Sequence, residues 1–195
     1  MPEIPSLTLI EILGASASLV YLVLLVKEKV LCWPFGILGS LLSIYLFYVS
    51  KLYSEAVLYF FYAVLGVWGW LRWHQRESRG SNPVIRHTLM YHLRACLLTA
   101  LAALGLGYFM LSATDAQRPM FDAFTTTFSF FATYLEIAKV LEAWGYWVIL
   151  NLASVWLYHD RALDIYAAQI AIYSVLSVWG FVSWRKTYLA QQATT

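Results

Sequence analysis

Long apolar runs, separated by short polar stretches, make up most of this chain. A bilayer core of about 30 Å is crossed by a helix of roughly 20 apolar residues, and the runs have about that length. The longest polar stretch, residues 74–87, contains the breakers Gly80, Ser81, Asn82 and Pro83 and is expected to be a loop. The pattern predicts seven membrane helices, at residues 9–26, 30–49, 56–73, 90–112, 121–138, 144–158 and 163–184.

Two parts of the chain share a register. Residues 62–70 read YAVLGVWGW and residues 173–181 read YSVLSVWGF, so six of nine positions are identical when Tyr62 is aligned with Tyr173. The register continues without a gap, because Trp33 then matches Trp144 and Trp73 matches Trp184. Such a register indicates internal duplication, which in an apolar chain is typical of transporters.

The duplication predicts how a single membrane domain, residues 1–195, is organised. A first three-helix repeat covers residues 9–73, a linker helix covers 90–112, and a second three-helix repeat covers 121–184. A unit of three helices ends on the side of the membrane opposite to the one on which it starts. The single extra helix brings the chain back across, so both repeats start on the same side and have the same orientation. We therefore expect an all-α integral membrane fold with a 3+1+3 parallel repeat.

Composition supports the membrane class. Hydrophobic residues form 61% of the chain, charged residues only 12%, and the mean hydropathy is +0.65, whereas soluble domains carry about 25% charged residues. A net charge of +2 gives no reason to expect nucleic acid as a partner. Cys32 and Cys96 lie in apolar surroundings and suggest neither a disulfide nor a metal site. Residues 1–8 lack the basic start of a signal peptide, so none is expected.

The basic residues predict an orientation. One side of the membrane would hold only Lys51, Arg118 and Arg161. Cytoplasmic loops are enriched in Lys and Arg, so the bias predicts a periplasmic N-terminus and a cytoplasmic C-terminus in a bacterial inner membrane. The other, cytoplasmic side would hold Lys27, Lys29, Arg72, Arg76, Arg79, Arg86, Arg94, Lys139, Arg185 and Lys186.

The sequence WGYWVILN places Trp144, Trp147 and Asn151 at spacings i, i+3 and i+7, on one helical face. Indole faces attract flat cations, and a mid-membrane amide both donates and accepts hydrogen bonds. Alternatively, the tryptophans belong to the interfacial aromatic belt and Asn151 joins two helices. For Trp144 both interpretations stay open, while Trp147 and Asn151 together favour a binding site. Their counterparts in the first repeat are Trp33, Gly36 and Ser40.

A polar stripe follows the segment 121–138. Its members are spaced by four, three, four and three residues, so they share one face and fit the wall of a pathway. Glu136 could pair with a cationic substrate, or instead with Lys139 three residues further along. Both interpretations stay open. The members of the stripe are Asp122, Thr126, Ser129, Thr133 and Glu136.

Aromatic residues fill the third helix of each repeat. Because Tyr62 and Tyr173 share the register, helix packing is favoured for them over substrate binding. The same holds for Trp68–Gly69 and Trp179–Gly180. Trp73 and Trp184 lie beside basic residues and are expected to be interface anchors. The remaining members are Tyr59, Trp70 and Tyr166, with Gln169 among them.

Nothing in the sequence indicates an enzyme. No nucleophile–base pair, metal-ligand cluster or phosphate loop is evident, and no cofactor is expected. The four histidines, which lie in or near predicted loops, are His74, His87, His92 and His159.

Taken together, the motif WxxWxxxN at residues 144–151, the endings GWLRW and GFVSW, and the 3+1+3 plan resemble the PnuC family of bacterial vitamin transporters. The resemblance covers residues 33–184. It implies a fold similar to the SWEET sugar transporters, facilitated diffusion, a cytoplasmic kinase that traps the vitamin by phosphorylation, and a possible homotrimer. It also implies that Trp147 and Asn151 contact the substrate, with Trp144 close by.

The family has branches for nicotinamide riboside, thiamine and riboflavin. Nicotinamide riboside members often carry a Gln and an apolar residue where this chain has Thr133 and Glu136. This departure and the short chain favour thiamine, a cation whose aminopyrimidine ring Glu136 could bind. Nicotinamide riboside stays the alternative, with riboflavin behind it. Ion-coupled transport with Glu136 as proton carrier, and a non-transporting membrane receptor or assembly protein, also stay open.

Overall fold

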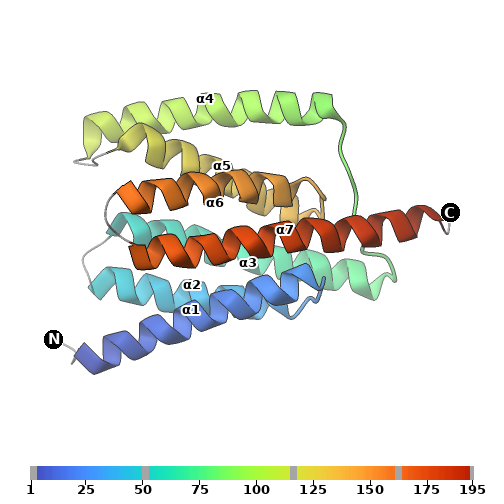
Figure 1. Cartoon of the computed structure of the whole chain (residues 1–195), viewed down its shortest axis with the longest axis horizontal. Coiled ribbons are helices and arrows are strands. Elements are labelled where there is room, and N and C mark those ends of the chain that lie inside the picture. Colours follow the sequence, from blue (N-terminus) through green and yellow to red (C-terminus); the bar gives the residue numbers. More distant parts are fainter. Residues whose placement is uncertain (1–3, 50–52, 115–117, 161–163, 194–195) are drawn as a thin grey trace. The chain divides into compact units, whose positions relative to one another are not determined.

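The computed structural model describes residues 4–49, 53–114, 118–160 and 164–193. These residues form two compact units, Met1–Asn82 and Pro83–Thr195. In the first unit, α1 (Ile4–Val26), α2 (Cys32–Val49) and α3 (Tyr53–Ser78) lie alongside one another, with α2 packed against both neighbours (Figure 1). A helix satisfies its own backbone hydrogen bonds, which an apolar surrounding requires.

The second unit has four helices among its described residues. They are α4 (Leu89–Ala113), α5 (Pro119–Ile137), α6 (Ala143–Asp160) and α7 (Asp164–Ala193), and each packs against the next along the chain. Large apolar side chains of α4, such as Leu98 at 67% exposure, point away from the unit. Such exposure suits a lipid surrounding, where an apolar outer face has no cost.

All seven predicted helices are present among the described residues. The bilayer crossing of α5, α6 and α7 stays a prediction. By length and composition alone, the stretches apolar enough to cross a membrane are Leu7–Val26, Cys32–Val49, Ala56–Ser78 and Leu89–Ala113.

The predicted ends of two helices are wrong. α3 continues to Ser78 and α7 to Ala193, so the expected loop at residues 74–87 begins as helix. The extensions are rich in Arg, Lys, Glu and Gln, which are strong helix formers. Hydropathy marks only the apolar part of a helix, and so it stops short of these charged turns.

α1 and α5 end in the same way. Glu28 and Lys139 are the non-glycine residues with positive φ in the described chain, at 57° and 58°. In each turn the next residue bonds back five positions, Lys29 to Leu24 at 3.0 Å and Val140 to Leu135 at 2.9 Å. This is the Schellman arrangement, in which glycine usually occupies the left-handed position. Glu28 and Lys139 occupy equivalent positions in the sequence register, so the turn is repeated along with the helices.

Each unit also contains a tryptophan packed against a glycine. A β-carbon on Gly69 would lie 2.5 Å from the ring of Trp33, and one on Gly180 would lie 2.5 Å from the ring of Trp144. Only glycine fits at these two positions, because a methyl group would overlap the indole.

The interface-anchor prediction for Trp73 and Trp184 is wrong. Both are 0% exposed. Trp73 meets Trp33 edge-on at 5.5 Å between ring centroids, and Trp184 meets Trp144 edge-on at 5.3 Å. Both therefore complete the glycine–tryptophan contacts within their own unit. Gly69 and Gly180 do pack as predicted, but the packing prediction is wrong for the rings of Trp68 and Trp179, which are 37% and 43% exposed.

A short segment before α4 attaches to the turn between α5 and α6. The backbone N–H of Ile85 donates to the carbonyl of Lys139 at 2.9 Å, and the Ile85 carbonyl accepts from the N–H of Leu141 at 2.9 Å. Ile85 and Val140 thus form an isolated parallel bridge. Thr88 caps the helix that follows, because its Oγ accepts a hydrogen bond from the backbone N–H of Tyr91 at 3.3 Å.

The Trp144–Gly180 contact predicts that one methyl group added at Gly180 strongly lowers the stability of the protein. We expect Gly180→Ala to lower the free energy of unfolding by about 1–3 kcal/mol, because the added carbon overpacks against a rigid ring. The control is Gly105→Ala in α4, where nothing lies within 4 Å of the added carbon. That change should be neutral or stabilising by about 0.5–1 kcal/mol. Thermal unfolding in detergent micelles measures both, and equal stabilities would contradict the packing argument.

Candidate functional site

The predicted face of α6 divides into a packing residue and two candidate contact residues. Trp144 is 0% exposed because it is enclosed by Gly180 and Trp184. Trp147 is half-buried. Its indole N–H is buried and has no hydrogen-bond partner among the described residues. The indole N–H groups of Trp33 and Trp144 are also buried without a partner among the described residues. What distinguishes Trp147 is its half-buried ring, whereas the Trp144 ring is enclosed in the α6–α7 packing.

Asn151 is held by α7. Its Nδ2 donates to the Ser177 Oγ at 3.2 Å, and the Ser177 hydroxyl donates to the Tyr173 carbonyl at 2.8 Å. Because the hydroxyl proton is used on that carbonyl, the Ser177 Oγ has to accept from Asn151. This fixes which way the amide points. Asn151 and Ser177 are 8% and 2% exposed, so the arrangement lies inside the protein.

The polar stripe of α5 is buried at its C-terminal end. Thr133 and Glu136 are buried, and Ser129 is half-buried. The Thr133 hydroxyl donates to the Ser129 carbonyl at 2.9 Å, which satisfies it within the helix. Asp122 and Thr126 are half-buried too. α5 packs against α6, so the stripe belongs to the same unit as Asn151.

The spacing argument for a Glu136–Lys139 pair assumed that the helix continues. α5 ends at Ile137, and Lys139 adopts a left-handed conformation with φ of 58°. The two residues therefore do not share a helical face. Both side chains are nevertheless buried, at 2% and 3% exposure. The choice between substrate contact and pairing stays open.

The first unit shows a different arrangement at the equivalent positions. A β-carbon on Gly36 would lie 2.8 Å from the Tyr21 ring, so Tyr21 fills this space. In the register, Gly36 corresponds to Trp147 and Tyr21 to Ala132. The large ring thus comes from the first helix in one unit and from the second helix in the other. Ser40, the counterpart of Asn151, is 8% exposed.

The other predicted contacts are placed as follows. Trp33 and Tyr62 lie in the first unit, where Trp33 is 1% exposed and Tyr62 is half-buried against Tyr59. Tyr173 is half-buried on α7 and accepts the Ser177 hydrogen bond. Gln169 lies outside the residues whose side chains are described.

Sequence reasoning missed Ser177. Its counterpart is Gly66, and this pair is one of the three differing positions in the nine-residue match. A serine that replaces a glycine inside an otherwise repeated helix is a usable signal. It marks a place where the second unit adds a polar group.

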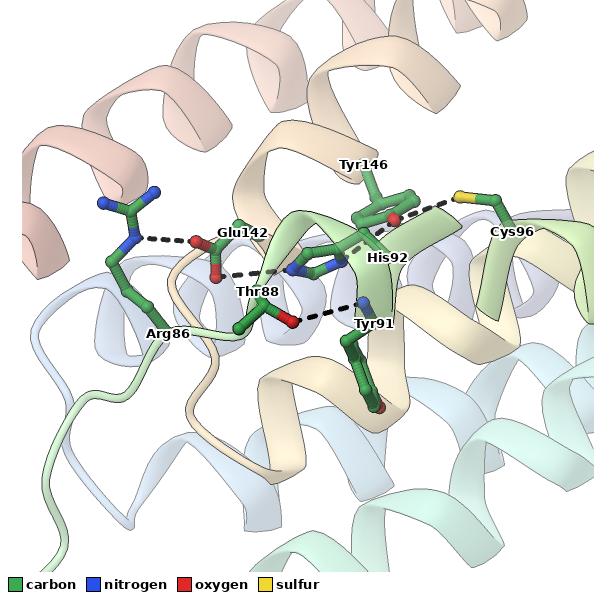
Figure 2. Close-up of polar contacts among 7 residues, drawn as sticks. All are labelled: Arg86, Thr88, Tyr91, His92, Cys96, Glu142 and Tyr146. Carbon is green, nitrogen blue, oxygen red and sulfur yellow. Dashed lines mark hydrogen bonds and ion pairs between the residues drawn. The ribbon is translucent and has the colours of Figure 1, made fainter. Parts of the chain in front are cut away.

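A second polar cluster, comprising Arg86, His92, Cys96, Glu142 and Tyr146, joins α4 to the start of α6 (Figure 2). Arg86 Nε donates to Glu142 Oε1 at 2.7 Å, and this bond and charge raise the pKa of Arg86. His92 Nε2 lies 3.7 Å from Glu142 Oε2. On its other side, His92 Nδ1 lies 3.1 Å from the Tyr146 hydroxyl, which is 3.2 Å from the Cys96 sulfur.

This cluster positions helices. Within the described parts of the chain, no three His, Cys, Asp or Glu side chains are grouped to hold a metal ion. Its members come from the segment before α4, from α4 itself, from the turn before α6 and from the first turn of α6. They therefore fix α4 to the start of α6.

The chain matches known proteins over most of its length. Residues 8–186 match the model of the family described as "Nicotinamide mononucleotide transporter". It is 22% identical to the "Nicotinamide riboside transporter PnuC" of Escherichia coli (strain K12), over 91% of this chain and 85% of that protein. The protein of that name from Neisseria mucosa is also 22% identical, over 89% of this chain and 70% of that protein.

A solved structure shares the fold. It is described as the "Crystal structure of the Vitamin B3 transporter PnuC" and superposes with a TM-score of 0.75 at 20% identity. The match covers 91% of this chain and 81% of that one. At this identity the likeness concerns the fold alone.

The positioning cluster leads to a prediction for Tyr146. We expect Tyr146→Phe to lower the free energy of unfolding by about 1 kcal/mol, because it removes the hydroxyl shared by His92 and Cys96. Tyr108→Phe on α4 is the matched control, since Tyr108 is 66% exposed. Thermal unfolding in micelles distinguishes the two variants. A stability of Tyr146→Phe equal to that of Tyr108→Phe would show that the Tyr146 hydroxyl contributes nothing to stability.

Proposed function

Since the chain belongs to the nicotinamide mononucleotide transporter family, we propose that it carries nicotinamide riboside across the bacterial inner membrane. The protein is a multi-pass membrane transporter and not an enzyme, as its relatives and its apolar helices agree. The names of its relatives favour nicotinamide riboside over thiamine, which the sequence alone had favoured. No relative described above supports thiamine.

The chemistry of the second unit supports this substrate. Nicotinamide riboside consists of a positively charged pyridinium ring with a carboxamide, joined to a ribose. The half-buried face of Trp147 can cover a flat cation. The observation with most weight is the oriented Asn151 amide, whose Nδ2 is fixed by Ser177 at 3.2 Å. One N–H and the carbonyl oxygen remain for a partner, and a carboxamide offers the complementary pair.

Thiamine is the second candidate because of α5. Glu136 is a buried carboxylate, and Thr133 lies one turn before it on the same face. A carboxylate accepts hydrogen bonds from an aminopyrimidine ring and favours a positive charge nearby. It would also favour the pyridinium of nicotinamide riboside, so Glu136 does not discriminate between the two vitamins.

We also propose a 3+1+3 organisation with parallel, SWEET-like repeats and a periplasmic N-terminus. The repeat is supported by the recurrence, at equivalent positions of the sequence register, of one turn geometry and one glycine–tryptophan contact. The periplasmic N-terminus is supported by the distribution of Lys and Arg alone. Transport would be facilitated diffusion, with net uptake maintained by a cytoplasmic kinase that phosphorylates the vitamin. Assembly as a homotrimer belongs to the same proposal.

Uptake into proteoliposomes tests the function. Vesicles that enclose ATP and a nicotinamide riboside kinase should accumulate labelled nicotinamide riboside, whereas vesicles without kinase should only equilibrate. Thiamine and riboflavin, each with its own kinase, complete the panel. Uptake of thiamine alone would overturn the substrate, and no uptake of any vitamin would favour a receptor or assembly protein. Uptake that collapses with the proton gradient would contradict facilitated diffusion.

Site variants test the residues. Asn151→Ser gives the second unit the residue of the first, and Trp147→Leu removes the indole but keeps apolar bulk. We expect each to weaken nicotinamide riboside binding by about 1–3 kcal/mol, through lost hydrogen bonds or ring contact. Ser40→Ala at the equivalent position of the first unit is the control and should bind as the parent does. Calorimetry on purified protein measures the dissociation constants. Parent-like affinity in both site variants would leave Trp147 and Asn151 as structural residues.

A further inference from the structure

An open groove of about 430 Å³ follows one side of α3 near its end. None of its lining residues is among those assigned to substrate binding. All the lining residues come from α3, so the groove is a property of the first unit alone. They are Trp68, Leu71, Arg72, Gln75, Arg76 and Arg79.

The groove is strongly basic. Arg72, Arg76 and Arg79 are spaced by four and three residues, so their side chains share one helical face. The Arg72 guanidinium lies over the Trp68 ring, 5.6 Å from its centroid. Like charges at this spacing disfavour the helix. An anion between them would relieve the repulsion.

The same side of α3 becomes apolar toward the middle of the helix. Val64, Trp68 and Leu71 are 50%, 37% and 54% exposed. The apolar stretch that contains them, Ala56–Ser78, is long enough to cross a membrane. One helix face therefore passes from an apolar surface, through a tryptophan, to three arginines. A phospholipid has the same order of groups, from acyl chain through the interface to phosphate.

The second unit lacks this feature. In the register, the three arginines correspond to Ser183, Thr187 and Ala190 of α7, while Trp68 corresponds to Trp179. The apolar and aromatic part of the face is thus repeated and the basic part is not. Repeated helix packing cannot account for three arginines present in only one copy.

We propose that this groove binds the headgroup of an anionic phospholipid. The arginines contact the phosphate, Trp68 lies at the interface, and Leu71 contacts the start of an acyl chain. Clusters of basic residues at the membrane surface attract anionic lipids, and each Lys or Arg raises the affinity roughly fivefold. The proposal rests on the membrane placement of α3 and is independent of the vitamin carried.

Native mass spectrometry of the purified full chain tests the proposal. The probes are phosphatidylglycerol and phosphatidylcholine with identical acyl chains, added from detergent. We expect the parent protein to bind phosphatidylglycerol more tightly. Arg72→Gln combined with Arg79→Gln should weaken this binding by about 25-fold, from two lost cations at roughly fivefold each. Arg185→Gln combined with Lys186→Gln is the control, because it removes two exposed positive charges from the equivalent end of α7.

Three outcomes would overturn the proposal. They are equal binding of both lipids by the parent, equal losses in the groove variant and the control, and displacement of the lipid by millimolar inorganic phosphate. The last would show a site for a free anion instead of a lipid. Circular dichroism and thermal unfolding verify that both double variants are folded, so that a loss of binding can be assigned to the groove.

Discussion

The indole of Trp144 lies against bare backbone at Gly180, and the close approach of α6 and α7 depends on this contact. Between helices in lipid there is little hydrophobic driving force, so close packing over small residues has to hold them together. The hydrogen bond from Asn151 to Ser177 joins the same two helices at 3.2 Å, near the upper end of the usual range. Any further separation of the helices would weaken it. The hydrogen bond at the candidate site therefore depends on the apolar contact between Trp144 and Gly180, which takes no part in that hydrogen bond.

The two units keep this framework and change what is placed on it. Both have the glycine, the two edge-on tryptophans and the left-handed turn. They differ at positions next to the framework, where Gly36 and Ser40 correspond to Trp147 and Asn151. Because the framework fixes the helix separation, residues beside it can change without loss of packing. This explains how one unit can fill a space with Tyr21 while the other holds the Asn151 amide and the half-buried indole of Trp147.

The sequence predicted the helices well, because the width of a bilayer sets the length of an apolar run. It predicted the end of α3 poorly, since charged residues up to Ser78 form helix but have no hydropathy signal. Trp73 and Trp184 were misassigned because a tryptophan beside a basic residue looks the same whether it faces lipid or a neighbouring ring. The spacing of Trp147 and Asn151 was visible in one helix. Ser177 was not, because a contact between two helices leaves no periodicity in either.

The attachment of α4 also constrains the order of events during synthesis. Ile85 bonds to Lys139 and Leu141, and Arg86 pairs with Glu142, so every partner follows α4 and α5 in the chain. When α4 leaves the ribosome, none of these partners has yet been made. The first unit, in contrast, has all three of its helices by Ser78. The packing of the first unit can therefore precede the attachment of α4 to residues 139–142, which follow α5 in the chain.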